Sequence, residues 1–185
     1  MTEPIVKQDH FRVFQGWQRC CQKHVDLMQR QPHFRISPLV EVKREHFMDA
    51  RFAALQLRPH QIQVVIYHSP CPDGFLAATI LLSALPASVI YIGTDHRSLT
   101  RVLYHYRDYY CLLVDIAPTV SDLALLQPER FVVLDHHESS RETFAQLTPA
   151  QGIYEPKRSG CGLAWQYVYA KWCMPYLVAA VEARD

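Results

Sequence analysis

The sequence predicts an α/β domain with a doubly wound, mostly parallel sheet of the Rossmann-like type, preceded by a helical N-terminal extension. Four short apolar runs rich in β-branched residues recur between residues 63 and 135, and segments of helical character separate them. Strands that alternate with helices in this way form parallel sheets. Successive positions of each run are apolar, which is typical of strands covered by helices on both faces. Right-handed crossovers then wind the helices onto both sides of the sheet.

The apolar runs and the prolines set the expected boundaries of the elements. Strands are expected at 63–67, 88–92, 111–115 and 131–135. Helices are expected at 75–85, at 99–106, at 120–126, from Gly162 through residue 172, and from Pro175 onward. Pro128 prevents the helix at 120–126 from running on, because proline cannot continue a helix interior.

Composition and charge limit the function classes. The chain has 185 residues, of which 49% are hydrophobic and 20% are charged. This is ordinary for a globular protein and too apolar for a disordered one. The net charge of +1 excludes a general basic field of the kind that draws a protein to nucleic acid or to an anionic membrane.

Residues 1–60 are expected to form the helical extension, and residues 61–185 the sheet domain. An amphipathic helix is expected from apolar side chains that recur at helical spacing on one face, namely Phe11, Phe14, Trp17, Cys21, His24 and Met28. A second helix is expected around residues 42–57. Two interpretations of the extension are open: it packs on the sheet domain as a buttress, or it is a basic appendage that binds substrate or a partner.

One uncharged stretch, residues 74–94, is long enough to span a bilayer, but Pro86 splits it into a helix and a strand. No membrane association is therefore expected. The first ten residues contain no apolar signal-peptide core, so a cytoplasmic location is expected, with the nucleus as an alternative. The six cysteines match no structural zinc spacing, and we expect buried thiols in a reducing compartment.

Potential metal ligands follow three of the four expected strands. They are His68, Cys71 and Asp73 after the first strand, Asp115 at the end of the third, and Asp135, His136 and His137 at the end of the fourth. Ligands bind beyond the carboxyl ends of the strands in an open α/β sheet, so these side chains are expected at one edge. Each has an ordinary structural alternative, such as a turn at Asp73 or a helix cap at Asp115. Buried together, the carboxylates would be unfavourable unless cations compensated them.

This ligand set favours a particular chemistry. Imidazole combined with carboxylates suits Mn²⁺, Fe²⁺ or Zn²⁺. More ligands are present than one catalytic zinc requires, and carboxylates can bridge two ions. Two ions roughly 3.5–4 Å apart would hold a hydroxide and stabilise the entering and leaving oxygens of an in-line displacement at phosphorus. We therefore expect hydrolysis of a phosphate ester or anhydride.

A second feature is expected to bind phosphate. Lys157, Arg158, Ser159 and Gly160 stand just before the apolar helix that begins near Gly162. Small residues at a helix start expose backbone N–H groups, and the two cations beside them favour an anion. The alternative is a glycine-marked loop that leads into a core helix. The stretch is not a P-loop, because the G-x-x-x-x-G-K-[ST] pattern is absent.

At these residues the chain resembles the DHH phosphoesterase superfamily. That group includes single-strand exonucleases of the RecJ type, nanoRNA hydrolases, cyclic-dinucleotide phosphodiesterases and manganese inorganic pyrophosphatases. The resemblance covers about residues 64–185 and keeps the family order of four motifs, which read VVIYHSPCPDGFLAA, LLVDIAP, VVLDHHESS and RSGCGLAW. The CPDG form is similar to an uncharacterised branch of DHH proteins rather than to a well-studied enzyme.

The resemblance implies a role for each of these residues. The implied metal ligands are His68 and Asp73, one for each ion, Asp115 as the bridge between the ions, and His136 in the second site. His137 would contact the scissile phosphate, and Asp135 would orient a histidine from behind. The implied cofactor is a pair of Mn²⁺ ions, with Mg²⁺, Fe²⁺ or Zn²⁺ as alternatives.

The chain departs from the family pattern in two places. Cys71 stands where many members have an aspartate, and it either ligates a softer metal or lines the turn. The final Val-Glu-Ala-Arg-Asp is similar to the family's V-E-D-R-D, with Ala183 in place of an acid, which makes Asp185 the expected further ligand. Family enzymes usually carry a C-terminal domain that closes the cleft and selects substrate, and we expect a form without it.

Three functional hypotheses follow. The first is a metal-dependent phosphoesterase that hydrolyses a phosphodiester or phosphoanhydride bond of a phosphorylated small molecule or short nucleic acid, using a hydroxide activated between two ions. The second is a catalytically degenerate DHH-like domain that binds nucleotide, metal or a protein partner. The third is a nucleophilic hydrolase built on Cys71, for which no other part of the chemistry is visible. The residues do not indicate an oligomeric state.

Overall fold

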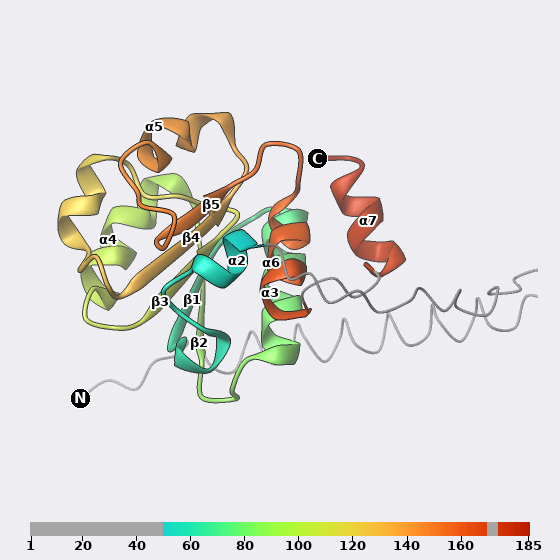
Figure 1. The fold of residues 1–185 in the computed structure, drawn as a ribbon, viewed down its shortest axis with the longest axis horizontal. Helices are drawn as coiled ribbons and strands as arrows, with labels where there is room; N and C mark the ends of the chain where they lie inside the picture. Colours follow the sequence, from blue (N-terminus) through green and yellow to red (C-terminus); the bar gives the residue numbers. More distant parts are fainter. Residues whose placement is uncertain (1–49, 170–173) are drawn as a thin grey trace, which may run out of the picture. The chain divides into compact units, whose positions relative to one another are not determined.

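Five parallel strands form one sheet in the computed structural model, which describes residues 50–169 and 174–185 (Figure 1). The strands are β1 Val64–His68, β2 Ile90–Thr94, β3 Cys111–Val114, β4 Phe131–Asp135 and β5 Gly152–Tyr154. Their order across the sheet is β2-β1-β3-β4-β5, and every neighbouring pair is parallel. The expected α/β fold with a parallel, Rossmann-like sheet is confirmed.

The strand order reverses at β1. This strand pairs with β2 on one side and with β3 on the other, so that Tyr67 lies opposite both Gly93 and Val114. The chain therefore leaves β1 in one direction and returns to continue the sheet in the other. The loops after β1 and β3 leave on opposite sides, and the crevice that opens between them is where such sheets bind ligands.

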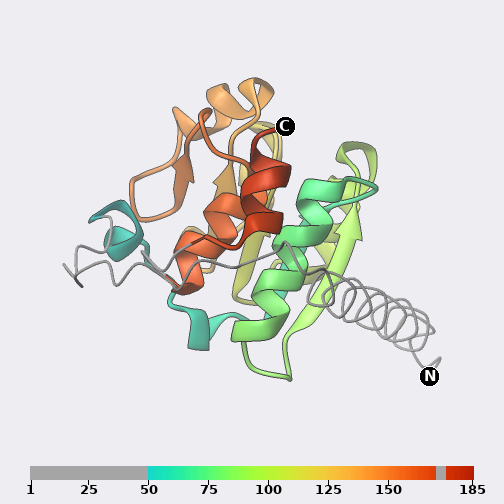
Figure 2. The same cartoon turned by 90° about the vertical axis from the view of Figure 1, so that its right-hand side faces the viewer.

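Helices cover both faces of the sheet. In the described part of the chain they are α2 Ala50–Ala54, α3 Pro72–Ala84, α4 His96–Tyr106, α5 Arg141–Phe144, α6 Gly160–Tyr169 and α7 Tyr176–Glu182. Helices α3 and α6 lie side by side on one face, and α7 packs against both of them (Figure 2). Helix α4 covers the opposite face together with a 3₁₀ turn, η2 Ser121–Leu125. The sheet is therefore doubly wound.

The central strands are buried along nearly their whole length. All residues of β3 and β4 are buried, as are the first four of β1. Alternate residues such as Val64, Ile66 and Leu113 share one cluster with Leu99 and Leu103 of α4. Their neighbours face the layer of α3 and α6, because successive side chains of a strand point to opposite faces. Burial on both faces explains the uninterrupted apolar runs of the sequence.

The helix expected at 120–126 is wrong as an α-helix: it is the 3₁₀ turn η2. The Asp122 carboxylate accepts hydrogen bonds from the Thr119 backbone N–H at 3.1 Å and from the Thr119 hydroxyl at 2.8 Å. The Asp122 N–H in turn donates to the Thr119 hydroxyl at 3.2 Å, and this reciprocal capping box starts the turn. Pro128 then follows before another helical turn is complete.

Several further boundaries differ from expectation. Strand β2 is Ile90–Thr94 instead of 88–92, and α4 begins at His96 instead of residue 99. Helix α3 begins at Pro72, three residues earlier than expected, because proline fits the first position of a helix, where its missing N–H is not needed. Asp73 therefore lies in the first helical turn instead of a loop. Strand β5 was not expected, since its three residues are too few to form a recognisable pattern.

The structure describes only residues 50–60 of the expected extension. They contact the sheet domain: the backbone N–H of Gln56 donates to the Ala150 carbonyl at 2.9 Å, and the Tyr167 hydroxyl donates to the Leu57 carbonyl at 2.9 Å. The amphipathic helix expected to begin near Phe11 lies outside the described residues. Within the described ranges, every helix is too short or too polar to cross a bilayer.

The burial of the central strands predicts that two leucines contribute differently to the free energy of unfolding. Leu113 on β3 is fully buried, whereas Leu82 on α3 is 39% exposed. We expect Leu113→Ala to lower the free energy of unfolding by about 2–5 kcal/mol, because it leaves a cavity in the core. Leu82→Ala should change it by less than about 1 kcal/mol. Urea denaturation followed by circular dichroism measures both, and equal losses would contradict this assignment of the core.

Candidate metal centre

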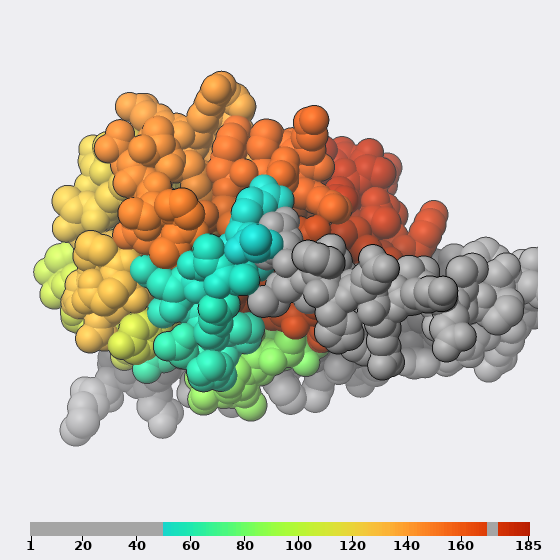
Figure 3. Space-filling model, in the orientation of Figure 1, coloured from blue at the N-terminus to red at the C-terminus, as the bar shows by residue number. Residues whose placement is uncertain are grey.

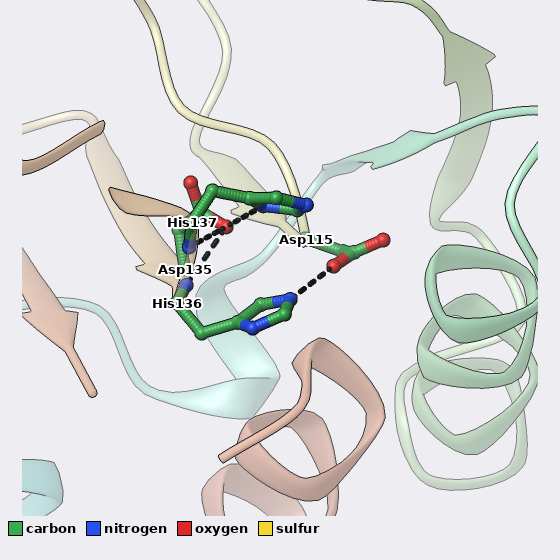
Figure 4. Close-up of side chains that lie close together, drawn as sticks. All are labelled: Asp115, Asp135, His136 and His137. Carbon is green, nitrogen blue, oxygen red and sulfur yellow. Dashed lines mark hydrogen bonds and ion pairs between the residues drawn. The ribbon is translucent and has the colours of Figure 1, made fainter. Parts of the chain in front are cut away.

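The side chains expected as metal ligands converge at the carboxyl edge of the sheet, where the strand order reverses. His68 ends β1, Asp73 lies in the first turn of α3, Asp115 follows β3, and Asp135 ends β4 with His136 and His137 directly after it. Figure 4 shows the Asp115 carboxylate facing the His136 ring, with His137 beside it. The reversal of strand order brings these separate loops together.

The Asp115 carboxylate lies at the centre of this cluster and is fully buried. Its Oδ1 is 3.1 Å from Nε2 of His136, and its Oδ2 is 3.6 Å from Nδ1 of His68. Both Oδ2 and the His68 Nδ1 are buried without a hydrogen-bond partner among the described residues. Such orphaned polar atoms are unfavourable, and a cation between them would compensate both. With an imidazole at each oxygen, the carboxylate has the arrangement that a bridging ligand needs.

The backbone around the Asp115 carboxylate is unusual in two ways. Asp115 has a φ of 60°, a left-handed conformation that residues other than glycine rarely adopt. Two glycines border its side chain. A Cβ at Gly160 would lie 2.5 Å from the Asp115 Cβ, and a Cβ at Gly74 would lie 2.9 Å from Oδ2. A side chain at either position would clash with the Asp115 side chain, so only glycine fits there.

Asp73 is held by the N-terminus of α6. Its Oδ1 accepts from the backbone N–H of Cys161 at 2.8 Å, and its Oδ2 accepts from that of Gly160. The same Oδ2 lies 3.5 Å from Nε2 of His136. The exposed N–H groups and dipole of a helix start stabilise an anion. The helix start therefore binds an anion, as expected, but the anion is the carboxylate of Asp73.

Some of the residues expected to bind phosphate have partners within the protein. Gly160 donates its N–H to Asp73, and the Ser159 hydroxyl accepts from the Gly162 N–H at 3.1 Å, which caps α6. Arg158 forms an ion pair with Glu182 at 2.9 Å. Lys157 is exposed at the surface. Phosphate binding by this segment stays a prediction.

Helix α7 brings Asp185 into the cluster, where its Oδ2 lies 3.2 Å from Nε2 of His136. One turn earlier, Glu182 latches α7 to the start of α6. Its carboxylate accepts from Nη1 of Arg158 at 2.9 Å and from the Ser159 N–H at 3.3 Å. A Cβ at Gly162 would overlap the Glu182 carboxylate, so this glycine makes room for the latch. The expected ligand Asp185 is thus held in place by its own helix.

Asp135 supports the two histidines from behind. It is fully buried, and its Oδ1 accepts from the His136 backbone N–H at 2.8 Å. The same oxygen lies 2.7 Å from Nδ1 of His137. This contact fixes the orientation of the His137 ring and leaves its Nε2 for other partners.

Burial and hydrogen bonding shift the pKa values of several side chains in the cluster. Burial raises the pKa of Asp115 to about 7. The hydrogen bond to Asp135 raises the pKa of His137 to about 9. Burial opposes ionisation of Asp135, but the bond from His137 outweighs it and lowers the pKa of that carboxyl. Burial lowers the pKa of His68, which keeps this imidazole neutral and able to bind a metal.

Donor atoms within 4.8 Å of one another fall into three groups among the described residues. The groups are Asp115 with Asp135, His136 and His137; His68 with Cys71 and Asp115; and Asp73 with His136 and Asp185. Asp115 and His136 each belong to two groups, so the groups adjoin. Cys71 sits at the N-cap of α3, and burial raises the pKa of its thiol. Its position therefore fits both roles expected from the sequence.

Sequence reasoning missed two residues that shape the site. Glu182 was not singled out, although its spacing of three residues from Asp185 places both on one side of a helix end. Gly74 was not singled out either, although it lies inside α3 where the His68 carbonyl and the Asp115 carboxylate leave no room for a side chain. No pattern in the sequence shows which side chain a helical glycine will approach.

Comparisons with known proteins give little that bears on activity. No protein-family model matches the chain, and no solved structure matches it. An uncharacterized protein of Acanthamoeba polyphaga mimivirus is 25% identical over 148 residues, which cover 68% of this chain and 33% of the viral protein. The chain therefore spans about a third of the length of that relative.

A separate hollow of about 710 Å³ lies beside β5 and is lined by Arg141, Phe144, Tyr154 and their neighbours. Figure 3 shows the molecular face that carries α5, β5 and α2. The hollow contains none of the candidate metal ligands. It is therefore not part of the metal centre.

The buried charge of Asp115 predicts that removing it stabilises the metal-free protein. The pKa of this carboxyl rises from 3.8 to about 7 on folding, so its ionisation opposes folding increasingly between these values and fully above them. Asn tolerates the left-handed backbone. At pH 8 in EDTA, Asp115→Asn should raise the free energy of unfolding by roughly 1–3 kcal/mol, and the gain should shrink towards pH 5. Urea denaturation measures it, and a loss at pH 8 would contradict the account.

The latch predicts that Glu182 controls one half of the centre. Glu182→Ala should weaken Mn²⁺ binding at the Asp185 side roughly 10- to 100-fold, as loss of a supporting residue commonly does. The other Mn²⁺ should bind as before. Isothermal titration calorimetry measures both events, and Glu129→Ala, at an exposed position, is the control. Unchanged binding of both ions in Glu182→Ala would show that the latch is unnecessary.

Proposed function

We propose that the protein is a divalent-metal-dependent phosphohydrolase that acts on a phosphodiester or phosphoanhydride bond of a small nucleotide or short oligonucleotide. Two Mn²⁺ ions are the favoured cofactor, and Mg²⁺, Fe²⁺ or Zn²⁺ are alternatives. The observation that carries the proposal is the buried Asp115 carboxylate with an imidazole at each oxygen and an unpartnered Oδ2.

The residues present fit a pair of cations. One would be held by His68 and Asp115, with the Cys71 thiol nearby. The other would be held by Asp73, His136 and Asp185. Nitrogen and oxygen donors of this kind suit Mn²⁺, and a thiolate would shift the preference of the first position towards Zn²⁺ or Fe²⁺.

Different residues of the chain would have different roles in hydrolysis. The bound ions supply a water of lowered pKa and neutralise charge on the phosphoryl group. Asp115 would hold the two ions at a fixed separation. Asp135 fixes the His137 ring through Nδ1, and the raised pKa of His137 keeps it protonated. Its Nε2–H would therefore donate to a phosphoryl oxygen and stabilise negative charge that develops there.

A second candidate function is a catalytically degenerate domain that binds nucleotide, metal or a protein partner. One observation favours it: Arg158, a cation expected beside the substrate phosphate, is paired with Glu182, and the Gly160 N–H is taken by Asp73. This alternative predicts metal binding without turnover.

Metal content and turnover, measured on the same preparations, separate the two candidates. Wild-type protein should retain close to two Mn²⁺ per chain by elemental mass spectrometry and hydrolyse a member of a panel that includes a dinucleotide, pyrophosphate and bis(p-nitrophenyl) phosphate. His136→Ala should lose at least one ion and lower turnover by about 100-fold or more. His105→Ala, an exposed position on α4, should match wild type.

Two results would count against the enzyme. Two bound ions with no turnover across the panel would favour the binding domain. Turnover that His136→Ala leaves unchanged would place the activity elsewhere.

A further inference from the structure

A fourth imidazole approaches the metal centre from β2, a strand to which the sequence assigned no ligand. His96 is the first residue of α4 and follows β2 by two positions. Strand β2 runs beside β1, with Thr94 opposite His68. The Ser69 N–H also donates to the Thr94 carbonyl at 2.9 Å, which ties the two strand ends together. The sheet therefore delivers His96 to the same edge as the expected ligands.

His96, His68 and His137 lie close together. The ring centroids of His96 and His68 are 5.2 Å apart, those of His96 and His137 are 6.3 Å apart, and those of His68 and His137 are 5.8 Å apart. The rings are tilted or perpendicular to one another, so none is stacked face to face. The separations lie in the range of ring contacts, so the three imidazoles form one group at this edge of the sheet.

The His96 ring is available to a ligand and is held in position. It is exposed, and within the described ranges it makes ring contacts but no hydrogen bond or ion pair. Asp95, just before it, caps α4 by accepting from the Ser98 N–H at 2.8 Å. This cap fixes the backbone from which the His96 side chain projects.

His96 borders the metal centre without belonging to it. None of the three groups of potential metal donors in the described part of the chain includes it. Several imidazoles in one group can offer N–H donors to an anion with several oxygens, and a phosphoryl group is such an anion. His137, a member of this group, is the residue placed against the phosphoryl group in the proposed function.

We propose that His96 is a substrate-contacting residue whose imidazole N–H donates a hydrogen bond to a phosphoryl oxygen, on the β2 side of the centre and across from His137. This inference rests on the proposed phosphohydrolase function. It deepens that function by adding His96 to the side chains that would contact the phosphoryl group. The hydrogen bond needs only a neutral imidazole, because one ring nitrogen always carries a proton.

Binding of inorganic phosphate to the Mn²⁺-loaded protein tests the proposal without relying on turnover. By isothermal titration calorimetry, His96→Ala should weaken phosphate binding roughly tenfold, the effect of one lost hydrogen bond to a charged group. His96→Gln keeps an N–H donor and should recover part of the loss. Both variants should retain the manganese content of wild type. His105→Ala, on the exposed side of the same helix, should bind phosphate as wild type does.

A second measurement reads the contact in the unmodified protein. Diethyl pyrocarbonate acylates accessible imidazoles, and peptide mass spectrometry locates the modified residue. Phosphate should protect His96 at least several-fold in the Mn²⁺-loaded protein and leave His105 unprotected. Equal modification of His96 with and without phosphate would overturn the proposal.

The outcomes separate this inference from the function on which it rests. If wild type binds manganese and phosphate but His96→Ala binds phosphate within twofold of wild type, the role of His96 is refuted and the phosphohydrolase remains. If wild type binds neither manganese nor phosphate, both proposals fall. Loss of manganese in His96→Ala would also overturn the inference, because it would make His96 a metal ligand.

Discussion

The buried carboxylate of Asp115 is the constraint around which the centre is built. Its backbone is left-handed, its side chain is fully buried, and one of its oxygens has no hydrogen-bond partner among the described residues. A residue in this state lowers the stability of the metal-free fold. Folds keep such strain where it serves binding or catalysis. Gly74 and Gly160 border this side chain, and a Cβ at either position would clash with it.

The remaining elements supply partners to this carboxylate from different directions. The reversal of strand order places the ends of β1 and β3 side by side, which brings His68 to one oxygen. Strand β4 brings His136 to the other. The start of α6 holds Asp73 through backbone N–H groups, and the same helix start holds α7 through Glu182. The start of α6 thus positions two acidic side chains next to His136. It holds Asp73 directly, and it holds Asp185 through α7.

Much of this arrangement could be predicted from the sequence, because doubly buried strands leave continuous apolar runs and their ends must share an edge. That reasoning located His68, Asp115 and the three residues from Asp135 onward. It failed where the deciding contacts join distant residues. The contact between Asp73 and the start of α6, across 87 residues, was not predicted. Strand β5, with only three residues, and the 3₁₀ form of the turn at 121–125 were missed because apolar periodicity does not report them.

We propose that the Asp115 carboxylate would bridge two metal ions. Anomalous diffraction from crystals grown with Mn²⁺ would locate the ions without reference to any activity. Two manganese peaks are expected roughly 3.5–4 Å apart, each in contact with one oxygen of Asp115. A single peak, or two peaks of which Asp115 contacts only one, would contradict it.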